Sequence, residues 1–285
     1  MDLRPMDDAD IQAAFATSQA AFEARNERWP ATTEPADVRW RRGLERVRHL
    51  LDTDPQGAWV ADDGTGVRGV AMALVREGVW GLSLLAVAPS VQSNGLGRRL
   101  LERALATAEG TRAQIILSSL DPRALRSYAR AGFALQPAVE GFGVVRRDAI
   151  PGGLGVREGE SADLDLAAAV DREQRGAAHG PDHEKLLEAG FGLLVLPDRG
   201  YVFERDGSPA LLAARDEDGA RALLWAALAA APPAHECGVM FVTQRQGWAV
   251  PVMLDAGLSL EPCGPTFVRG KPGPMSPYLP NPAYL

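Results

Sequence analysis

One stretch of the sequence constrains the fold more than any other: "SLLAVAPSVQSNGLGRRLLERALATA", residues 83–108. An apolar run ends at Pro89, a polar loop with Gly95 and Gly97 follows, and the loop leads into an amphipathic pattern typical of a helix. A helix N-terminus presents unpaired N–H groups and the positive end of the helix dipole, and glycines let a ligand approach the backbone closely. The pattern predicts a strand–loop–helix unit whose loop binds an anion, best a phosphate or pyrophosphate. A turn in which glycine only relieves strain is the alternative.

The loop does not fit two common nucleotide-binding motifs. No Gly-Lys-Ser/Thr follows it, as a Walker A loop would require. The third glycine of the dinucleotide-binding fingerprint is absent, and no acidic residue ends a second strand about 20 residues on.

Two motifs resemble those of the GNAT superfamily of N-acyltransferases. The first is Val87-Ala88-Pro89 followed by Gln92-x-x-Gly95-x-Gly97, which matches the acyl-CoA-binding loop of that family. The second, about 30 residues later, is Asp121-x-x-Ala124-x-x-x-Tyr128-x-x-x-Gly132-Phe133, where the family has Asn in place of Asp121. The resemblance implies an α/β fold with a mixed sheet, and acetyl-CoA as cosubstrate.

The same resemblance implies which residues contact the cofactor. The backbone from Gln92 to Arg98 would hold the pyrophosphate, and a free N–H near Leu85 or Val87 would polarise the thioester carbonyl. An amine would attack directly, so no nucleophilic side chain is required. The expected cofactor contacts are Leu85, Ala86, Val87, Gln92, Ser93, Asn94, Gly95, Leu96, Gly97, Arg98, Arg99, Asp121 and Tyr128.

Tyr128 is the candidate general acid for the leaving thiolate, because a phenol pKa near ~10 lies above that of a thiol. Packing within its helix is the alternative role. The motifs do not identify the general base. The strand "VWGLSLLAV" has no glutamate, Glu34 and Glu77 are more typical of surface charges, and a water chain or a neutral amine would also serve.

The sequence pattern predicts that the chain consists of two similar halves. A strand, an acidic cap and an amphipathic helix begin near residue 3 and again near residue 155, after a linker of Pro151 and three glycines. We expect two tandem GNAT-like domains, 1–150 and 151–285. The second half carries Arg215-Asp216-Glu217-Asp218-Gly219 where the first has its glycine loop. Three carboxylates would repel a pyrophosphate, so this copy is expected to be degenerate. The second copy would then form one wall of the acceptor pocket or the surface of a homodimer.

The tail "KPGPMSPYLPNPAYL" is rich in proline and is expected to be extended. One hypothesis is that it threads back to the acetyl site, where the Leu285 carboxylate acts as the base. The alternative is an extended strap on the surface. Trp29 and Trp40 belong to the core or to a lid over the acceptor site.

Other motifs carry less weight. In "HGPDH", His179 and His183 have a spacing that suits a metal on a helix, but Gly180-Pro181 interrupts such a helix, so no metal is expected. His235 and Cys237 lie before a strand in an arrangement that disfavours a dyad.

Composition limits the class of function. Residues 1–150 carry 19 basic and 19 acidic side chains and residues 151–285 carry 11 and 18, so the net charge of −7 lies in the second half. This balance disfavours nucleic-acid binding. Two cysteines, no signal peptide pattern and no long apolar run indicate a cytoplasmic protein without a membrane span. The sequence predicts an N-acetyltransferase acting on a small-molecule or peptide amine. A non-catalytic acyl-CoA-binding sensor or scaffold is the alternative.

Overall fold

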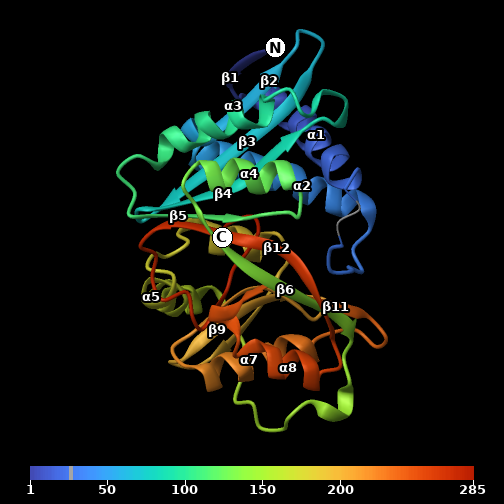
Figure 1. Ribbon diagram of the computed structural model, residues 1–285. Coiled ribbons are helices and arrows are strands. Elements are labelled where there is room, and N and C mark those ends of the chain that lie inside the picture. The colour runs from blue at the N-terminus through green and yellow to red at the C-terminus, as the bar shows by residue number, and fades with distance from the viewer. Residues whose placement is uncertain (26–27) are drawn as a thin grey trace.

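The computed structural model describes residues 1–25 and 28–285 and consists of two lobes stacked along one axis (Figure 1). The helices are α1 (Ile11–Glu23), α2 (Ala36–Thr53), α3 (Leu96–Leu105), α4 (Pro122–Arg130), α5 (Leu164–Gln174), α6 (Pro181–Glu188), α7 (Glu217–Ala229) and α8 (Ala249–Asp255). The strands are β1 (Asp2–Pro5), β2 (Ala58–Asp62), β3 (Val67–Arg76), β4 (Val79–Val87), β5 (Ala113–Leu117), β6 (Ala134–Val144), β7 (Arg157–Glu158), β8 (Gly192–Leu196), β9 (Gly200–Arg205), β10 (Ser208–Ala214), β11 (Glu236–Thr243), β12 (Ser259–Gly270) and β13 (Tyr278–Leu279).

The strands form two sheets, and the larger one crosses the middle of the chain. Its eight strands have the order β1-β2-β3-β4-β5-β12-β6-β11, and five others have the order β13-β10-β9-β8-β7. Strand β12, from the end of the sequence, lies between β5 and β6 of the first half and is antiparallel to both. The backbone pairing therefore continues across residue 150, and the division into domains 1–150 and 151–285 stays a prediction from the sequence pattern.

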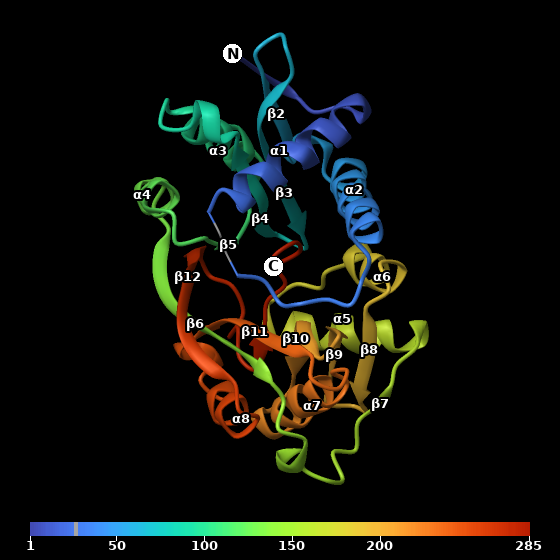
Figure 2. The same ribbon diagram turned by 90° about the vertical axis from the view of Figure 1, so that its right-hand side faces the viewer.

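Helices cover both faces of the first-half sheet, as Figure 2 shows. Strand side chains alternate between the faces. In β3, Val70 and Met72 pack in the cluster that contains residues of α1 and α2, whereas Ala71 and Ala73 pack in the cluster that contains residues of α3. Hydrophobic residues therefore fill both sides of a buried sheet.

Strand β4 separates from β5 part-way along its length. The parallel pairing covers only Val79 to Gly81, opposite Ala113 to Ile115. Beyond that point β4 continues beside β3, and β5 continues beside β12. An irregularity in the β3–β4 register leaves Ser83 as an extra residue. The separation opens a wedge between two adjacent strands of one sheet.

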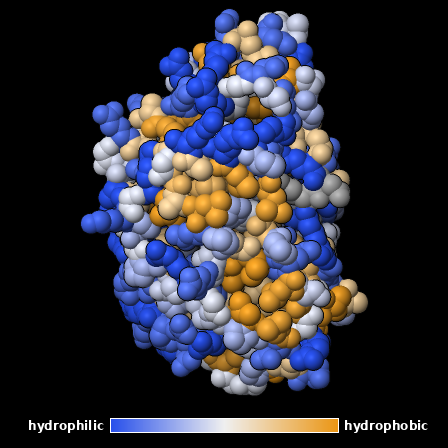
Figure 3. Space-filling view, in the orientation of Figure 1, coloured by the Kyte–Doolittle hydropathy of each residue, from blue (hydrophilic) through white to orange (hydrophobic). Residues whose placement is uncertain are grey.

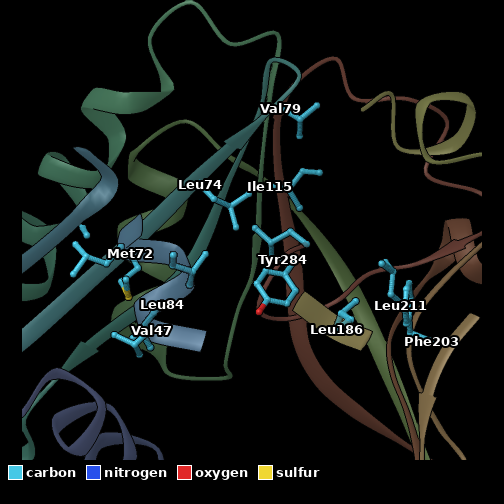
Figure 4. Close-up of a cluster of buried hydrophobic side chains, with 14 of the residues drawn as sticks. Val47, Met72, Leu74, Val79, Leu84, Ile115, Leu186, Phe203, Leu211 and Tyr284 are labelled. Atoms are coloured by element: carbon cyan, nitrogen blue, oxygen red, sulfur yellow. The ribbon is translucent and has the colours of Figure 1, made fainter. Parts of the chain in front are cut away.

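The end of the chain joins the two lobes. Strand β13 pairs with β10 of the smaller sheet. Tyr284 and Leu285 then enter a hydrophobic cluster that contains residues of β3, β4 and β5 as well as of α6, β9 and β10. Figure 4 shows Tyr284 between Leu74 and Ile115 on one side and Leu186 on the other. The tail is extended, as expected, but it lies in the interior and not on the surface.

A buried ion network also crosses between the halves. Arg76, at the end of β3, donates from Nε and Nη2 to the two carboxylate oxygens of Asp182 on α6, both at 2.8 Å. The same guanidinium binds Asp54 at 2.7 Å, and His49 Nε2 lies 2.7 Å from Asp182 Oδ1. Asp182 has no exposed side-chain surface. Polar contacts thus tie α6 to the first-half sheet.

The sequence pattern predicts that Gly180-Pro181 interrupts a helix, but α6 begins at Pro181. Proline at the first helical position removes an N–H that would have no partner there, so it starts a helix as readily as it ends one.

The outer surface shows two further features. No helix in the described parts of the chain combines the length and apolarity that crossing a membrane requires. Apolar side chains gather on the face shown in Figure 3. The exposed large hydrophobic residues of the described chain include Val144 of β6, Leu254 of α8 and Leu260 of β12.

Candidate acetyl-transfer site

A cavity of about 1120 Å³ lies where β4 and β5 separate, and it extends into the second half of the chain. One end is lined by the loop before α3 and by α4, and the wedge between the strands forms the middle. The other end is lined by residues of α1, α2, β6, β11 and β12 and by Pro282 of the tail. One continuous space therefore connects the glycine loop to residues from both halves.

The loop before α3 has the backbone geometry of an anion site. Gly95 is the N-cap of α3 with φ of 76°, a left-handed conformation that favours glycine, and no side chain caps the helix. A Cβ at Gly97 would meet only Val87 Cγ2, at 3.6 Å, so the fold itself does not exclude a side chain there. The free helix N-terminus and the small residue are both explained by a ligand that approaches the backbone.

Basic side chains line the same end of the cavity. They are Arg98 on α3 and Arg123, Arg126 and Arg130 on α4. Gln92 closes the loop by donating from Nε2 to the carbonyl oxygen of Val87 at 2.9 Å. The positive charge and the open N–H groups suit a phosphate-bearing molecule.

Asp121, the residue that departs from the family motif, caps α4. Its carboxylate accepts from the Arg123 N–H at 2.8 Å and from the Arg123 guanidinium, and Arg25 Nε lies 3.6 Å away. The hydrogen bonds from Arg123 outweigh the effect of burial and hold the pKa of Asp121 below its usual value. The carboxylate stays charged and is committed to its arginine partners.

Tyr128, on α4, is buried and lines the cavity. Its ring meets Phe267 edge-on with centroids 5.4 Å apart, and its hydroxyl has no hydrogen-bond partner among the described residues. Burial raises the pKa of the phenol well above its usual value; Arg25 lowers this pKa to a smaller extent, and Asp121 adds to the rise. The hydroxyl is therefore a protonated donor that faces the cavity.

The wedge itself is lined by β4. Leu82 to Leu85 and Val87 face the cavity on the edge that β5 has left. Ser83, the extra residue of the irregular register, has a buried Oγ with no hydrogen-bond partner within the described chain. Sequence reasoning missed Ser83, because a register irregularity leaves no mark in the residue pattern.

Four predicted site residues do not line the cavity. Ala86 packs in the hydrophobic cluster that contains residues of α1 and α2. Asn94 and Arg99 are exposed and lie off the cavity wall. Leu285 is fully buried, and its carbonyl oxygen accepts from the Tyr278 hydroxyl at 2.9 Å and lies 3.0 Å from His179 Nε2. This placement does not support Leu285 as the catalytic base.

The far end of the cavity is built from both halves of the chain. Phe22, Trp29 and Arg46 come from the first half, and the second half supplies Met240 and Phe241 of β11 with Cys263 and Gly264 of β12. Phe241 has φ of 57°, which is rare for a bulky residue, and lies where the β11–β6 register shifts. The Phe241 ring, which belongs to the second half, thus lines the cavity next to residues of the first half.

Comparisons with known proteins agree with this geometry. The model of the acetyltransferase (GNAT) family matches residues 18–133. Residues 18–133 are a GNAT acetyltransferase domain. Serotonin N-acetyltransferase 2, chloroplastic, of rice (Oryza sativa subsp. japonica) is 32% identical over 112 residues, which cover 37% of this chain and 56% of that protein. The chain thus matches little more than half of the length of this curated relative.

Solved structures extend the similarity to the whole chain. A protein from Pyrococcus horikoshii superposes with a TM-score of 0.78 at 16% identity and covers 99% of this chain and 94% of its own. A tandem GNAT protein from the clavulanic acid biosynthesis pathway superposes with a TM-score of 0.58 at 15% identity, covering 94% of this chain and 98% of its own. The predicted α/β fold with a tandem GNAT-like arrangement is confirmed.

Glu77 and Glu34, the two carboxylates named above as possible bases, lie in ion pairs away from the cavity. Glu77 binds Arg172 at 2.7 Å and the N–H of Ala178, and the hydrogen bond from Arg172 lowers its pKa. Glu34 binds Arg42 and Arg205. Neither lines the cavity, but Glu140 of β6 does and is buried. The residue pattern does not mark Glu140 as a site residue, because strand pairing with the second half brings it to the cavity.

The equivalent loop of the second half differs from that of the GNAT domain. Asp216 caps α7 by accepting from the Gly219 N–H at 2.8 Å, and Glu217 and Asp218 occupy the first turn. The helix N-terminus that is open in α3 is thus occupied by the chain's own carboxylate in α7.

The histidines of "HGPDH" meet an aspartate in the interior. His179 Nδ1 and His183 Nε2 lie 2.7 and 2.9 Å from Asp171 Oδ2, and the ligand atoms of all three residues lie within 4.8 Å of one another. The helix argument did not foresee this cluster, because Asp171 comes from α5 and His179 precedes α6. Tyr201 also donates to Asp171, so the carboxylate is the shared acceptor of a polar network. The absence of a metal stays a prediction.

Proposed function

We propose that the chain is an acetyl-CoA-dependent N-acetyltransferase that transfers acetyl to a primary amine. One observation carries the proposal: the open helix N-terminus, the wedge of β4 and the Tyr128 hydroxyl all line one cavity. The serotonin N-acetyltransferase relative and the match to the GNAT family support the same reaction. Acetyl-CoA would supply a thioester, an acyl group already activated for attack by an amine.

The residues present fit this cosubstrate. The backbone from Gln92 to Arg98 would bind the pyrophosphate, and arginines of α4 would neutralise the remaining phosphate charge. The exposed edge of β4 near Leu85 would donate an N–H to the thioester carbonyl oxygen. Apolar side chains of the wedge exclude water from the acyl group.

The transfer needs two proton movements that this cavity can provide. As the amine nitrogen bonds to the acyl carbon, the carbon–sulfur bond breaks and the nitrogen loses a proton. Tyr128 would donate its phenolic proton to the leaving sulfur, and Glu140, directly or through water, would accept the proton from nitrogen. Two carboxylates line the described cavity. Asp121 caps α4 and binds Arg123, whereas Glu140 lies on β6 at the end that both halves build, so its position makes Glu140 the better candidate.

The substitution Glu140→Gln tests the base. We expect kcat/KM at pH 7 to fall about 100-fold, because general base catalysis typically contributes that much. The loss should shrink as the pH rises toward 9, where more of the amine is already neutral. The pH–rate profile is the readout, and Glu188→Gln, which removes an exposed carboxylate on α6, is the control. A uniform loss at all pH values would assign Glu140 a structural role.

The function itself is tested by the release of CoA thiol from acetyl-CoA in the presence of a panel of amines. Amine-dependent release, with the acetylated amine detected by mass spectrometry, is the expected result. Binding of acetyl-CoA by calorimetry without turnover of any amine would favour a sensor or scaffold instead.

The second half serves, in this proposal, as the wall of the acceptor pocket and not as a second catalytic unit. Its contribution of Met240 and Phe241 to the cavity and its capped α7 support this division. The homodimer and the cytoplasmic location expected from the sequence stay predictions.

A further inference from the structure

We propose that the acceptor amine also carries an anionic group, a carboxylate in the simplest case, and that Arg46 binds it. The inference rests on the proposed function and adds the class of the acceptor. It begins from a cation that has no hydrogen-bond or ion-pair partner among the described residues.

Arg46 lies on α2 and lines the cavity, with its side chain partly buried. Within the described chain its guanidinium makes no ion pair and no hydrogen bond, although its neighbours do. Arg28 binds both Glu236 and Glu261 at 2.7 Å, and Arg42 binds Glu34 at 2.7 Å. Arg46 is therefore the exception among the arginines of this end.

The surroundings of Arg46 disfavour its charge. Burial is the main effect that lowers its pKa; Tyr284 acts in the opposite direction, and the nearby positive charge of Arg42 lowers the pKa further. An arginine stays protonated in a protein even so. A partly buried charge without a partner is destabilising, so an anion that enters the cavity would gain an interaction that the described residues do not provide.

The phosphates of the cosubstrate are not the natural partner of Arg46. Helix α2 covers the opposite face of the sheet from α3, as Figure 2 shows, whereas the open helix N-terminus belongs to α3. Arg46 lies instead at the end of the cavity that both halves of the chain build, where Trp29 also lies; we call this the acceptor end.

That end of the cavity combines opposite charges with apolar surface. Glu140 and Arg46 both line it, and Phe22, Trp29 and Phe241 lie around them. A carboxylate attracts an ammonium group and a guanidinium forms a fork that matches a carboxylate. The geometry thus suits an amino acid with an apolar or aromatic side chain better than a simple amine.

Matched pairs of amines, with and without a carboxylate, test the inference. The pairs are 5-hydroxytryptophan with serotonin and phenylalanine with phenethylamine, each assayed by CoA release. We expect kcat/KM to favour the carboxylated member, and Arg46→Gln to reduce this preference about 10- to 100-fold, as expected for a hydrogen bond between charged groups. Arg46→Lys should restore part of the preference, and Arg41→Gln, which removes an exposed arginine of the same helix, should leave it intact.

The outcomes separate this inference from the proposed function. If the members of each pair react equally well, or if Arg46→Gln keeps the wild-type preference, the inference is wrong although the enzyme is an N-acetyltransferase. If no amine reacts, the proposed function fails, and calorimetry decides the inference with 3-phenylpropionate added to the CoA-bound protein. Binding that weakens at least about 10-fold in Arg46→Gln would support it, and equal or absent binding would overturn it.

Discussion

Replacing Tyr128 with phenylalanine is expected to lower kcat about 1000-fold, because the leaving thiolate loses its proton donor. The KM for acetyl-CoA should change little, since the removed hydroxyl acts on the departing sulfur and not on the phosphates. The ring keeps its contact with Phe267, and the hydroxyl has no partner to lose in the described structure, so the thermal midpoint should stay close to that of the wild type. Steady-state kinetics and a thermal melt measure both quantities.

The pH dependence supplies a second test of Tyr128. An acid must be protonated to act, and burial raises the pKa of this phenol well above its usual value of about 10. Its deprotonation should therefore not limit the rate at any pH below about 10. A basic limb that begins near pH 8 and disappears in Tyr128→Phe would contradict this.

A matched control separates catalysis from packing. Tyr201→Phe also removes one buried hydroxyl, but that hydroxyl donates to Asp171 in the interior, far along the chain from the motif of α4. We expect it to lower the thermal midpoint and leave kcat unchanged. If both variants kept full activity, Tyr128 would be a packing residue only.

The sequence predicted the GNAT domain well because its signals are local. The loop from Gln92 to Arg98 and the segment from Asp121 to Phe133 each depend on turn glycines and helix periodicity within a few residues. The structure forms the expected loop and helix in both places. Local patterns therefore located one end of the cavity.

The acceptor end could not be predicted in the same way, because contacts distant in sequence build it. Glu140 reaches the cavity on a strand that pairs with β12 and β11, more than 90 residues later in the chain. Phe241 reaches the cavity at a register shift, and Arg46 stands out only because it has no partner among the described residues. Strand exchange between two halves and the absence of a contact are properties of the folded chain alone.

The buried network at Asp182 predicts the largest effect on stability. Asp182→Ala is expected to lower the free energy of unfolding by about 3–5 kcal/mol, the cost of leaving the opposite charge buried without its partner. The affected charge is Arg76, which keeps Asp54 but loses two hydrogen bonds of 2.8 Å. Urea denaturation measures the change, and Asp218→Ala, whose carboxylate is 87% exposed, should stay within about 0.5 kcal/mol of the wild type.

A double variant that removes both charges tests whether Arg76 and Asp182 stabilise the fold as an ion pair. In the double variant Arg76→Met/Asp182→Leu, neither member of this pair is left without the other, and Asp54 keeps its hydrogen bonds from Thr53 and the Val75 N–H, so we expect part of the lost stability to return. A double variant that is as unstable as the sum of the two single variants would show that the network contributes through independent contacts. In that case the contact between His49 and Asp182 would account for the stability that Asp182 contributes.

The same network predicts how stability depends on pH. Burial alone would raise the pKa of Asp182, but the hydrogen bonds from His49 and Arg76 outweigh it and hold the pKa below its usual value. A carboxyl whose pKa is lower in the folded state stabilises the protein fully above its unfolded pKa of about 4, and this contribution is lost as the pH falls through the folded value. The wild type should therefore lose stability below about pH 4, and Asp182→Asn should show a shallower acid slope over that range. Parallel slopes for the two proteins would mean that other carboxylates govern the acid transition, and that Asp182 stabilises the contact between α6 and the sheet without its charge.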